Sequence, residues 1–140
     1  MEQGTLTAIE KVIFLKSVDI FSRATIEELG GVAALTEEVH FEPGATIYRE
    51  GEPVDAIFLV LKGRVAVEAN GQVIGEVGEK QAFGTVAALD RNPAIHTVKA
   101  IDPVYALKLN AQDFDDILSL DFELVRAVFH ALCRLIRNSR

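Results

Sequence analysis

One stretch of the sequence has the residue types and spacing of a loop that holds a phosphate group. It reads FGTVAALDRNPAIHTV and runs from Phe83 to Val98. A glycine follows an aromatic residue, a short apolar turn comes next, and a proline precedes a β-branched run. In such a frame, the backbone N–H groups at the start of a helix can bind an anion. Charged side chains that would assist are few, because Arg91 and His96 are the only basic residues in the stretch.

The chain lacks the common sequence patterns of metal sites and of hydrolytic or nucleotide-triphosphate chemistry. Its histidines, His40, His96 and His130, are far apart, whereas a metal site in a β-roll needs clustered His and Glu ligands. Neither a Gly-x-x-x-x-Gly-Lys loop nor a Gly-x-Ser-x-Gly elbow is present. The acidic pair Asp115-Asp116 lies near the start of a predicted helix, where carboxylates offset the helix dipole. We therefore predict a binding or regulatory domain with no bound metal and no enzymatic activity.

Composition restricts the expected partners and compartment. The 140 residues include 14 Lys and Arg against 21 Asp and Glu, a net charge of −7. This excess of acid disfavours nucleic acid and anionic membranes, because both attract clustered cations. No apolar run is long enough to cross a membrane or to form a signal sequence. The single cysteine, Cys133, is expected to be buried in an apolar helix. Together these features predict a cytoplasmic domain that binds no nucleic acid and does not insert into membranes.

Hydrophobic periodicity divides the chain, read as a single domain over residues 1–140, into three parts. Residues 5–36 show helical spacing. Residues 38–109 consist of short β-branched runs separated by Gly and Pro, which is typical of an antiparallel double-sheet β-roll, a jelly-roll-like fold. Residues 111–137 are helical again and include a long amphipathic segment. The predicted fold is therefore mainly β, with helices before and after the roll.

Several local signals support this division. Thr7 precedes Glu10, and Thr25 precedes Glu28, at the spacing of a helix capping box. Asn70-Gly71 is the clearest turn, because both residues accept the positive φ of a two-residue type I′ hairpin. The apolar face of the second helix is expected to comprise Ile26, Leu29 and Ala33.

The last helix carries more apolar residues than one buried face needs. Apolar residues recur at steps of three and four, as in a coiled-coil seam. They are Phe122, Val125, Phe129, Leu132 and Ile136. A second row, Leu124, Val128 and Leu135, can cover the β-roll. We expect the seam to contact the same helix of a second copy in a homodimer; the alternative is that both faces belong to the domain's own core.

The chain resembles the cyclic nucleotide-binding domain of the catabolite activator (cAMP receptor protein) family over nearly its whole length. FEPGATIYREGEPVDAIFLVLKGRVAVE is similar to the first half of that family's β-roll, with Gly44, Gly51 and Gly63 at its turn positions. FGTVAALDRNPAIHTVKA is similar to the frame of its phosphate-binding cassette. The resemblance implies an eight-stranded roll with a short internal helix. It also implies that such a domain can be fused to, or act on, a partner domain.

The same resemblance implies a changed pocket. In the family, the cassette has Phe-Gly-Glu before the short helix and Pro-Arg after it. There the Arg pairs with the cyclic phosphate, and the Glu accepts a hydrogen bond from the ribose 2′-hydroxyl. This chain keeps Phe83-Gly84, but Thr85 replaces the Glu, Ala94 replaces the Arg, and the bulkier Ile95-His96 follows. The cassette is therefore expected to be degenerate, with neither cyclic AMP nor cyclic GMP as a normal ligand and no other cofactor.

Two nearby residues could restore a positive charge. Arg91 lies three residues before the lost Arg, and His96 can donate to an anion when protonated. Their simpler interpretations are an exposed loop residue and a strand residue, respectively. The full set of candidate pocket residues is Phe83, Gly84, Thr85, Val86, Ala87, Arg91, Ala94, Ile95 and His96.

The sequence is compatible with three functions to different degrees. The first is a non-enzymatic regulatory domain with a degenerate pocket, which acts by dimerisation or through a fused or separate partner domain. The second is a genuine sensor that binds a cyclic nucleotide, or a less charged ligand, through altered contacts with Thr85, Ile95 and His96. The third, a DNA-binding regulator, is disfavoured, because in the family that activity needs a helix-turn-helix beyond the long helix and only NSR follows RLIR here.

Overall fold

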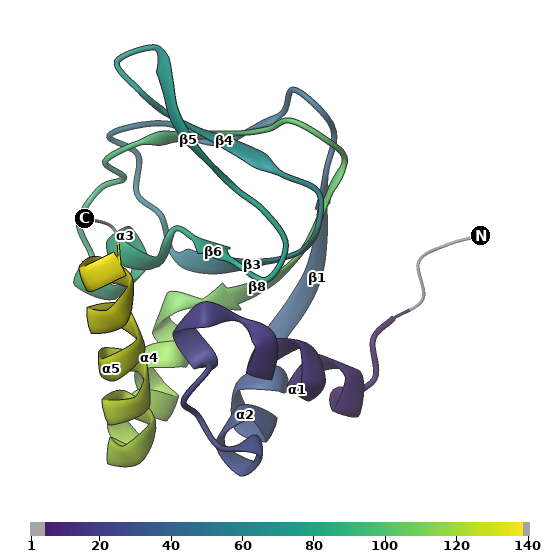
Figure 1. The fold of residues 1–140 in the computed structure, drawn as a ribbon, viewed down its shortest axis with the longest axis vertical. Coiled ribbons are helices and arrows are strands. Elements are labelled where there is room, and N and C mark those ends of the chain that lie inside the picture. The colour runs from purple at the N-terminus through teal and green to yellow at the C-terminus, as the bar shows by residue number, and fades with distance from the viewer. Residues whose placement is uncertain (1–4, 139–140) are drawn as a thin grey trace.

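The computed structural model describes residues 5–138, with helices at both ends of the chain and strands between them (Figure 1). The helices are α1 (Ala8–Ser17), the 3₁₀ helix η1 (Asp19–Phe21), α2 (Ile26–Ala33), α3 (Thr85–Asp90), α4 (Ala111–Leu120) and α5 (Phe122–Asn138). The strands are β1 (Thr36–Phe41), β2 (Thr46–Tyr48), β3 (Ala56–Lys62), β4 (Val65–Ala69), β5 (Gln72–Val77), β6 (Ala82–Phe83), β7 (Thr97–Ala100) and β8 (Val104–Asn110). This order confirms the predicted helix, β-roll, helix arrangement.

The strands form two antiparallel sheets of four. One has the order β1-β8-β3-β6 and the other β2-β7-β4-β5. Strands distant in sequence are paired: β8 lies between β1 and β3, with Ala106 opposite both Val39 and Val60. In Figure 1 the first sheet lies between the second sheet and the helices. The structure therefore confirms the antiparallel double-sheet roll.

Strand β3 is buried on both faces, which explains why residues 56–61 read as an unbroken apolar run rather than an alternating one. Ile57 and Leu59 belong to the apolar core beneath the helices. Phe58 and Val60 point the opposite way, into the core between the two sheets. β3 thus contributes to both cores, and it fixes the position of the helical layer relative to the β-roll.

The helical layer is anchored by aromatic packing and by its caps. Phe21 of η1 and Phe114 of α4 are fully buried, and their rings meet edge to face with centroids 5.8 Å apart. Burial contributes about 1.5–3 kcal/mol for each such side chain. Both predicted capping boxes are present at the starts of α1 and α2. The expectation for Ile26 was wrong: it is exposed in the first turn of α2, whereas Leu29 and Ala33 are buried.

The predicted hairpin turn is confirmed by its backbone angles. Asn70 has φ 54° and Gly71 has φ 80°, as a type I′ turn requires. The turn places Ala69 opposite Gln72 and joins β4 to β5. This hairpin forms the end of the second sheet and supplies two of the residues that line the cavity described below.

Helix α5 presents one face to the domain and another to solvent. Leu124, Val128 and Ala131 are buried against the helical layer, whereas Leu135, which was expected in this second row, is exposed, so that part of the expectation was wrong. Three seam residues lie on the solvent side, with exposures of 71% for Phe122, 61% for Phe129 and 67% for Ile136. Val125 and Leu132 are half-buried between the two faces. The alternative that both faces are core is therefore wrong for the three exposed positions.

Cys133 is exposed, so the prediction that it is buried was wrong. The surrounding run HALCRLI is apolar in composition. However, a residue two positions after the buried Ala131 is turned about 200° around the helix from it. This rotation puts the thiol on the solvent side of α5.

Candidate functional site

The candidate site forms where β6 passes into α3. Gly84 lies at this junction with φ 81°, in the left-handed region, and it is the N-cap residue of α3. A Cβ atom at this position would lie 2.8 Å from the backbone oxygen of Ala56. Glycine is therefore required here for two reasons, the positive φ and the close approach of β3. It sets the direction in which α3 leaves the sheet.

A cavity of about 240 Å³ opens beside this junction. Eight of the nine candidate residues line it, and Arg91 does not. The remaining lining comes from strands on both sides of the roll: Tyr48, Val67, Val77, Ala82 and Val98. The cassette residues could be found from the sequence because they are contiguous. The other five come from β2, β4, β5, β6 and β7, and only the sheet topology brings them to the cassette.

Aromatic packing fixes one wall of the cavity. Phe83 is buried and stacks on Phe58, with ring centroids 4.9 Å apart and an angle of 10° between the planes. The ring of Tyr48 lies 6.2 Å from that of Phe83, measured between centroids, with an angle of 40° between the planes. Phe83 therefore links the cassette to the core between the sheets, which holds the start of α3 in place.

Position 94 is held rigidly and points into the cavity lining. The amide of Ala94 donates to the carbonyl oxygen of Glu52, and its carbonyl oxygen accepts from Gly51 N–H, both at 2.8 Å. The Ala94 side chain is only 5% exposed and packs with Val54 and Ala87. Ile95, by contrast, is 62% exposed while still lining the cavity. A methyl group therefore fills the position from which the resemblance expects a charged anchor.

The polar groups of the cavity are neutral hydroxyls and one imidazole. They belong to Tyr48, Thr85 and His96, and no Arg or Lys is found among the described lining residues. Burial raises the pKa of Tyr48 to about 12, against a smaller opposing effect of a hydrogen bond with the backbone of Gly84. Tyr48 is therefore an uncharged hydroxyl at neutral pH. Such a lining suits hydrogen bonding to an uncharged molecule better than it suits neutralising an anion.

The structure places Arg91 away from the cavity. It follows α3 with φ 58°, and its Nη2 lies 2.7 Å from Asp115 Oδ2 and 3.4 Å from Gln112 Oε1, both on α4. Its guanidinium is directed to the helical layer, so Arg91 would have to leave Asp115 before it could act as a replacement phosphate anchor. His96, the other possible anchor, does line the cavity.

Residues 5–138 contain neither a metal-binding cluster nor a membrane-spanning helix. No group of three or more His, Cys, Asp or Glu side chains in this range is arranged to hold a metal ion. None of the helices in the same range is long and apolar enough to cross a membrane.

Known proteins share the family and the fold of this chain. The model of the family described as "Cyclic nucleotide-binding domain" matches residues 38–121. An uncharacterized NTE family protein of Mycobacterium tuberculosis is 28% identical over 127 residues, which cover 90% of this chain and 22% of the relative. The chain thus spans about a fifth of the length of that relative.

Solved structures share the fold. The N-terminal domain of a transcriptional regulator from Streptomyces coelicolor A3(2) has a TM-score of 0.78 at 24% identity, over 91% of this chain and 94% of that one. The regulatory subunit of a cAMP-independent protein kinase A from Trypanosoma cruzi, bound to guanosine, has a TM-score of 0.74 at 18% identity, over 84% and 42%. These likenesses concern the fold alone.

Proposed function

Because the chain belongs to the cyclic nucleotide-binding domain family, we propose that it is a non-enzymatic regulatory domain that does not bind cyclic AMP or cyclic GMP in the usual way. It transmits its regulatory state through the exposed face of α5 to a second copy or to another domain. A cytoplasmic setting is part of the same proposal. The family fold is established. We propose the loss of normal cyclic-nucleotide binding and the mode of action.

The observation that carries this proposal is the absence of Arg and Lys from the described lining of the cavity. A hydrogen bond to a charged group contributes about 1.5–3 kcal/mol. Losing both the Arg and the Glu anchors would cost about 4 kcal/mol, which corresponds to roughly a thousandfold in affinity. The net charge of −7 provides no long-range attraction for a phosphate. Backbone N–H groups at the start of α3 would leave only weak binding.

Restoring the anchors tests this proposal. The double variant Thr85→Glu, Ala94→Arg should bind cyclic AMP or cyclic GMP at least about a hundredfold more tightly than the unmodified chain. Adding Ile95→Ser should strengthen binding further, because a smaller side chain then stands beside the phosphate. Arg91→Ala is the matched control and should leave nucleotide binding unchanged, because Arg91 lies outside the cavity. If the restored variant folds but gains no affinity, the missing anchors do not explain the pocket.

A second candidate function rests on the neutral polar groups of the cavity. Tyr48, Thr85 and His96 could hydrogen-bond an uncharged ligand, and the apolar lining could cover its rings. The domain would then be a sensor of a molecule without a phosphate. Guanosine is a suitable first probe, because its base and ribose offer many hydrogen-bonding groups and it carries no charge. Saturable guanosine binding that is weakened by both Tyr48→Phe and Thr85→Val would favour this function over an empty pocket.

The exposed seam of α5 supports dimerisation as the mode of action. Phe122 and Phe129 are two large apolar side chains on one solvent-exposed side of an amphipathic helix. Coiled-coil partners bury residues with this spacing. We propose that two copies pair through this seam, and that the cavity influences the pairing through the segments that connect α3 to α4 and α5.

A further inference from the structure

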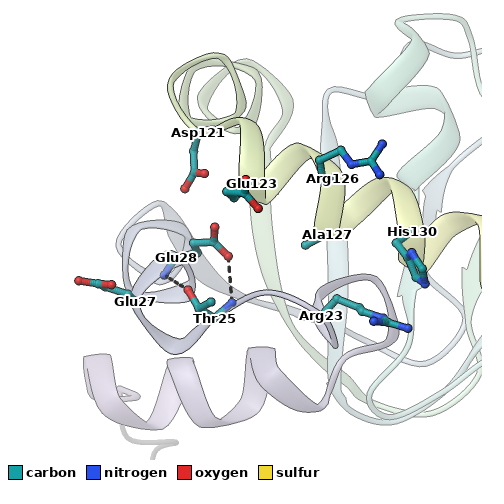
Figure 2. A pocket seen from close by; sticks show the side chains of 9 residues that line it. All are labelled: Arg23, Thr25, Glu27, Glu28, Asp121, Glu123, Arg126, Ala127 and His130. Atoms are coloured by element: carbon teal, nitrogen blue, oxygen red, sulfur yellow. Dashed lines mark hydrogen bonds between the residues drawn. The ribbon is translucent and has the colours of Figure 1, made fainter.

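A second cleft, separate from the cavity beside Gly84, lies between the start of α2 and α5 (Figure 2). Its volume is about 610 Å³, and its lining is mostly charged: Arg23, Thr25, Glu27, Glu28, Asp121, Glu123, Arg126, Ala127 and His130. Figure 2 shows the carboxylates gathered around the starts of α2 and α5, while Arg23, Arg126 and His130 lie toward the other end. The cleft is therefore divided by charge.

The carboxylates at the acidic end are already engaged with helix ends. Glu28 Oε1 accepts from the amide of Thr25 at 2.9 Å, and Asp121 Oδ1 accepts from the amide of Leu124 at 3.0 Å. Glu27 and Glu123 lie in the first turns of α2 and α5, where they offset the positive ends of the helix dipoles. Much of the negative charge at this end is therefore balanced locally.

The basic side chains at the other end have no such partners. Within residues 5–138, no carboxylate oxygen lies within 4.0 Å of Arg23, Arg126 or His130, although Arg64 and Arg91 both form ion pairs. Acidic residues outnumber basic ones, 21 to 14, in the whole sequence. Unpaired arginines in so acidic a chain indicate a surface available to an external anion.

The basic surface continues beyond the cleft along α5. Arg126, His130, Arg134 and Arg137 follow one another at steps of four, four and three, so they lie on one side of the helix. We call these four residues the basic stripe. It extends over about 16 Å of helix and is on a different side from the apolar seam that contains Phe129. A single small anion would engage only one part of such a surface, whereas several carboxylates in a row would match it.

We propose that Arg23 and the basic stripe bind an acidic peptide segment of a partner protein or partner domain. Carboxylates of the segment pair with the guanidinium groups, which can bind them through two hydrogen bonds each. Because each exposed pair contributes little, the contact is weak and sensitive to salt. The apolar seam remains free to form the dimer, so this surface offers a second means of contact and does not depend on the state of the ligand cavity.

The probe for this surface is a fluorescein-labelled oligoglutamate of about eight residues, which spans about 26 Å when extended. Fluorescence anisotropy at about 50 mM salt should show saturable binding to the unmodified chain, and this binding should be lost at about 300 mM salt. The variant Arg126→Glu, Arg134→Glu should bind at least about tenfold more weakly. The matched control Arg49→Glu, Lys62→Glu alters net charge equally on the β-roll and should change binding by less than about twofold.

Thermal unfolding of both double variants tests that they fold, and sedimentation tests that their association state is the same as that of the unmodified chain.

The proposal is overturned if the unmodified chain shows no saturable binding at low salt, or if the control weakens binding as much as the stripe variant does. It is also overturned if inorganic phosphate displaces the peptide whereas sodium chloride at the same ionic strength does not. That result would indicate a site for a small anion. Binding to vesicles containing anionic lipid, without binding to the peptide, would reassign the surface to a membrane. A failure of dimerisation or of the cavity proposal would leave these peptide results unaffected.

Discussion

Arg91 and Asp115 join the cassette to the helical layer through an ion pair, with Nη2 of the arginine 2.7 Å from Oδ2 of the aspartate. Arg91 directly follows α3, which lines the cavity beside Gly84, and Asp115 is on α4, which leads into α5. The arginine of this loop therefore contacts the helices instead of a ligand. This relationship gives the cassette a direct polar connection to the segment that carries the proposed dimer seam.

Breaking this ion pair should have a small effect on stability and none on nucleotide binding. Both side chains are partly exposed, 46% for Arg91 and 41% for Asp115, so solvent screens the pair and its contribution is about 0.2–1 kcal/mol. Arg91→Ala and Asp115→Ala should each lower the free energy of unfolding by an amount in this range. The double variant should lose less than the sum of the two, as measured by urea denaturation. Full additivity would show that the pair is not coupled in solution.

Gly84 should tolerate no larger residue. Gly84→Ala would place a Cβ atom 2.8 Å from Ala56 O at a positive φ, so we expect a loss of about 1–3 kcal/mol in the free energy of unfolding. Gly30→Ala is the control, because this glycine is in α2 and a Cβ atom added there would have no neighbouring atom within 4 Å. Alanine there should raise the free energy of unfolding by about 0.5–1 kcal/mol. Equal effects of the two substitutions in chemical denaturation would contradict the assigned roles.

Phe129→Glu should weaken or abolish the homodimer. A carboxylate in the seam would have to lose its water on pairing, at a cost of several kcal/mol. Because Phe129 is 61% exposed within one copy, the substitution should leave the thermal unfolding of the monomer nearly unchanged. Val73→Glu is the control, since Val73 is equally exposed but lies on β5, away from α5. Sedimentation equilibrium of the unmodified chain must show a dimer; a monomer at high concentration excludes the seam as a homodimer interface.

Stability should depend on pH through Glu38 and Tyr105. Tyr105 donates to Glu38 Oε1 at 2.5 Å, and the amide of Leu6 donates to Oε2 at 2.8 Å. The hydrogen bond from Tyr105 is the main cause that lowers the pKa of Glu38 below its ordinary value of 4.5. A lowered pKa means that folding favours the carboxylate, so this stabilisation is present above pH 4.5 and is lost as the pH falls through the lowered pKa.

Tyr105→Phe tests this linkage. The variant should be less stable than the unmodified chain at about pH 7, and the difference should shrink as the pH falls through the lowered pKa of Glu38. At the alkaline limit, burial together with the bond to Glu38 raises the pKa of Tyr105 to about 12 from 10.0. The tyrosine contribution is therefore present below pH 10 and is lost as the pH rises toward 12. Urea denaturation across the acid range is the measurement, and a difference independent of pH would refute the linkage.

Much of the fold could be predicted because its signals are local. Thr7 with Glu10, and Asn70 with Gly71, interact with close neighbours in the chain, so their structures follow from adjacent residues. The burial of Leu124 and Val128 on one side of α5 follows from helical periodicity, whereas Leu135 of the same expected row is exposed. The errors concern which side of a helix faces solvent. Ile26 and Cys133 lie in apolar segments but on sides that no other element covers.

The candidate site was only partly predictable. The cassette residues could be read as one segment, whereas Tyr48 and Val67 reach the cavity only through the pairing of β2 and β4 with β7. The direction of Arg91 depends on its left-handed backbone and on Asp115, which is distant in sequence. The charged cleft forms only because the segment around the start of α2 packs beside α5, and no local sequence pattern specifies that packing.

The central claim is that the cavity lacks an anchor for a cyclic phosphate, and calorimetric titration of the unmodified chain with cyclic AMP and cyclic GMP tests it most directly. With Ala94 in the anchor position and Arg91 bound to Asp115, we predict no saturable binding in the micromolar range and a Kd of about 1 mM or weaker for both nucleotides. A micromolar Kd for either nucleotide would contradict the claim. It would show that His96, or an arginine released from α4, provides the missing charge.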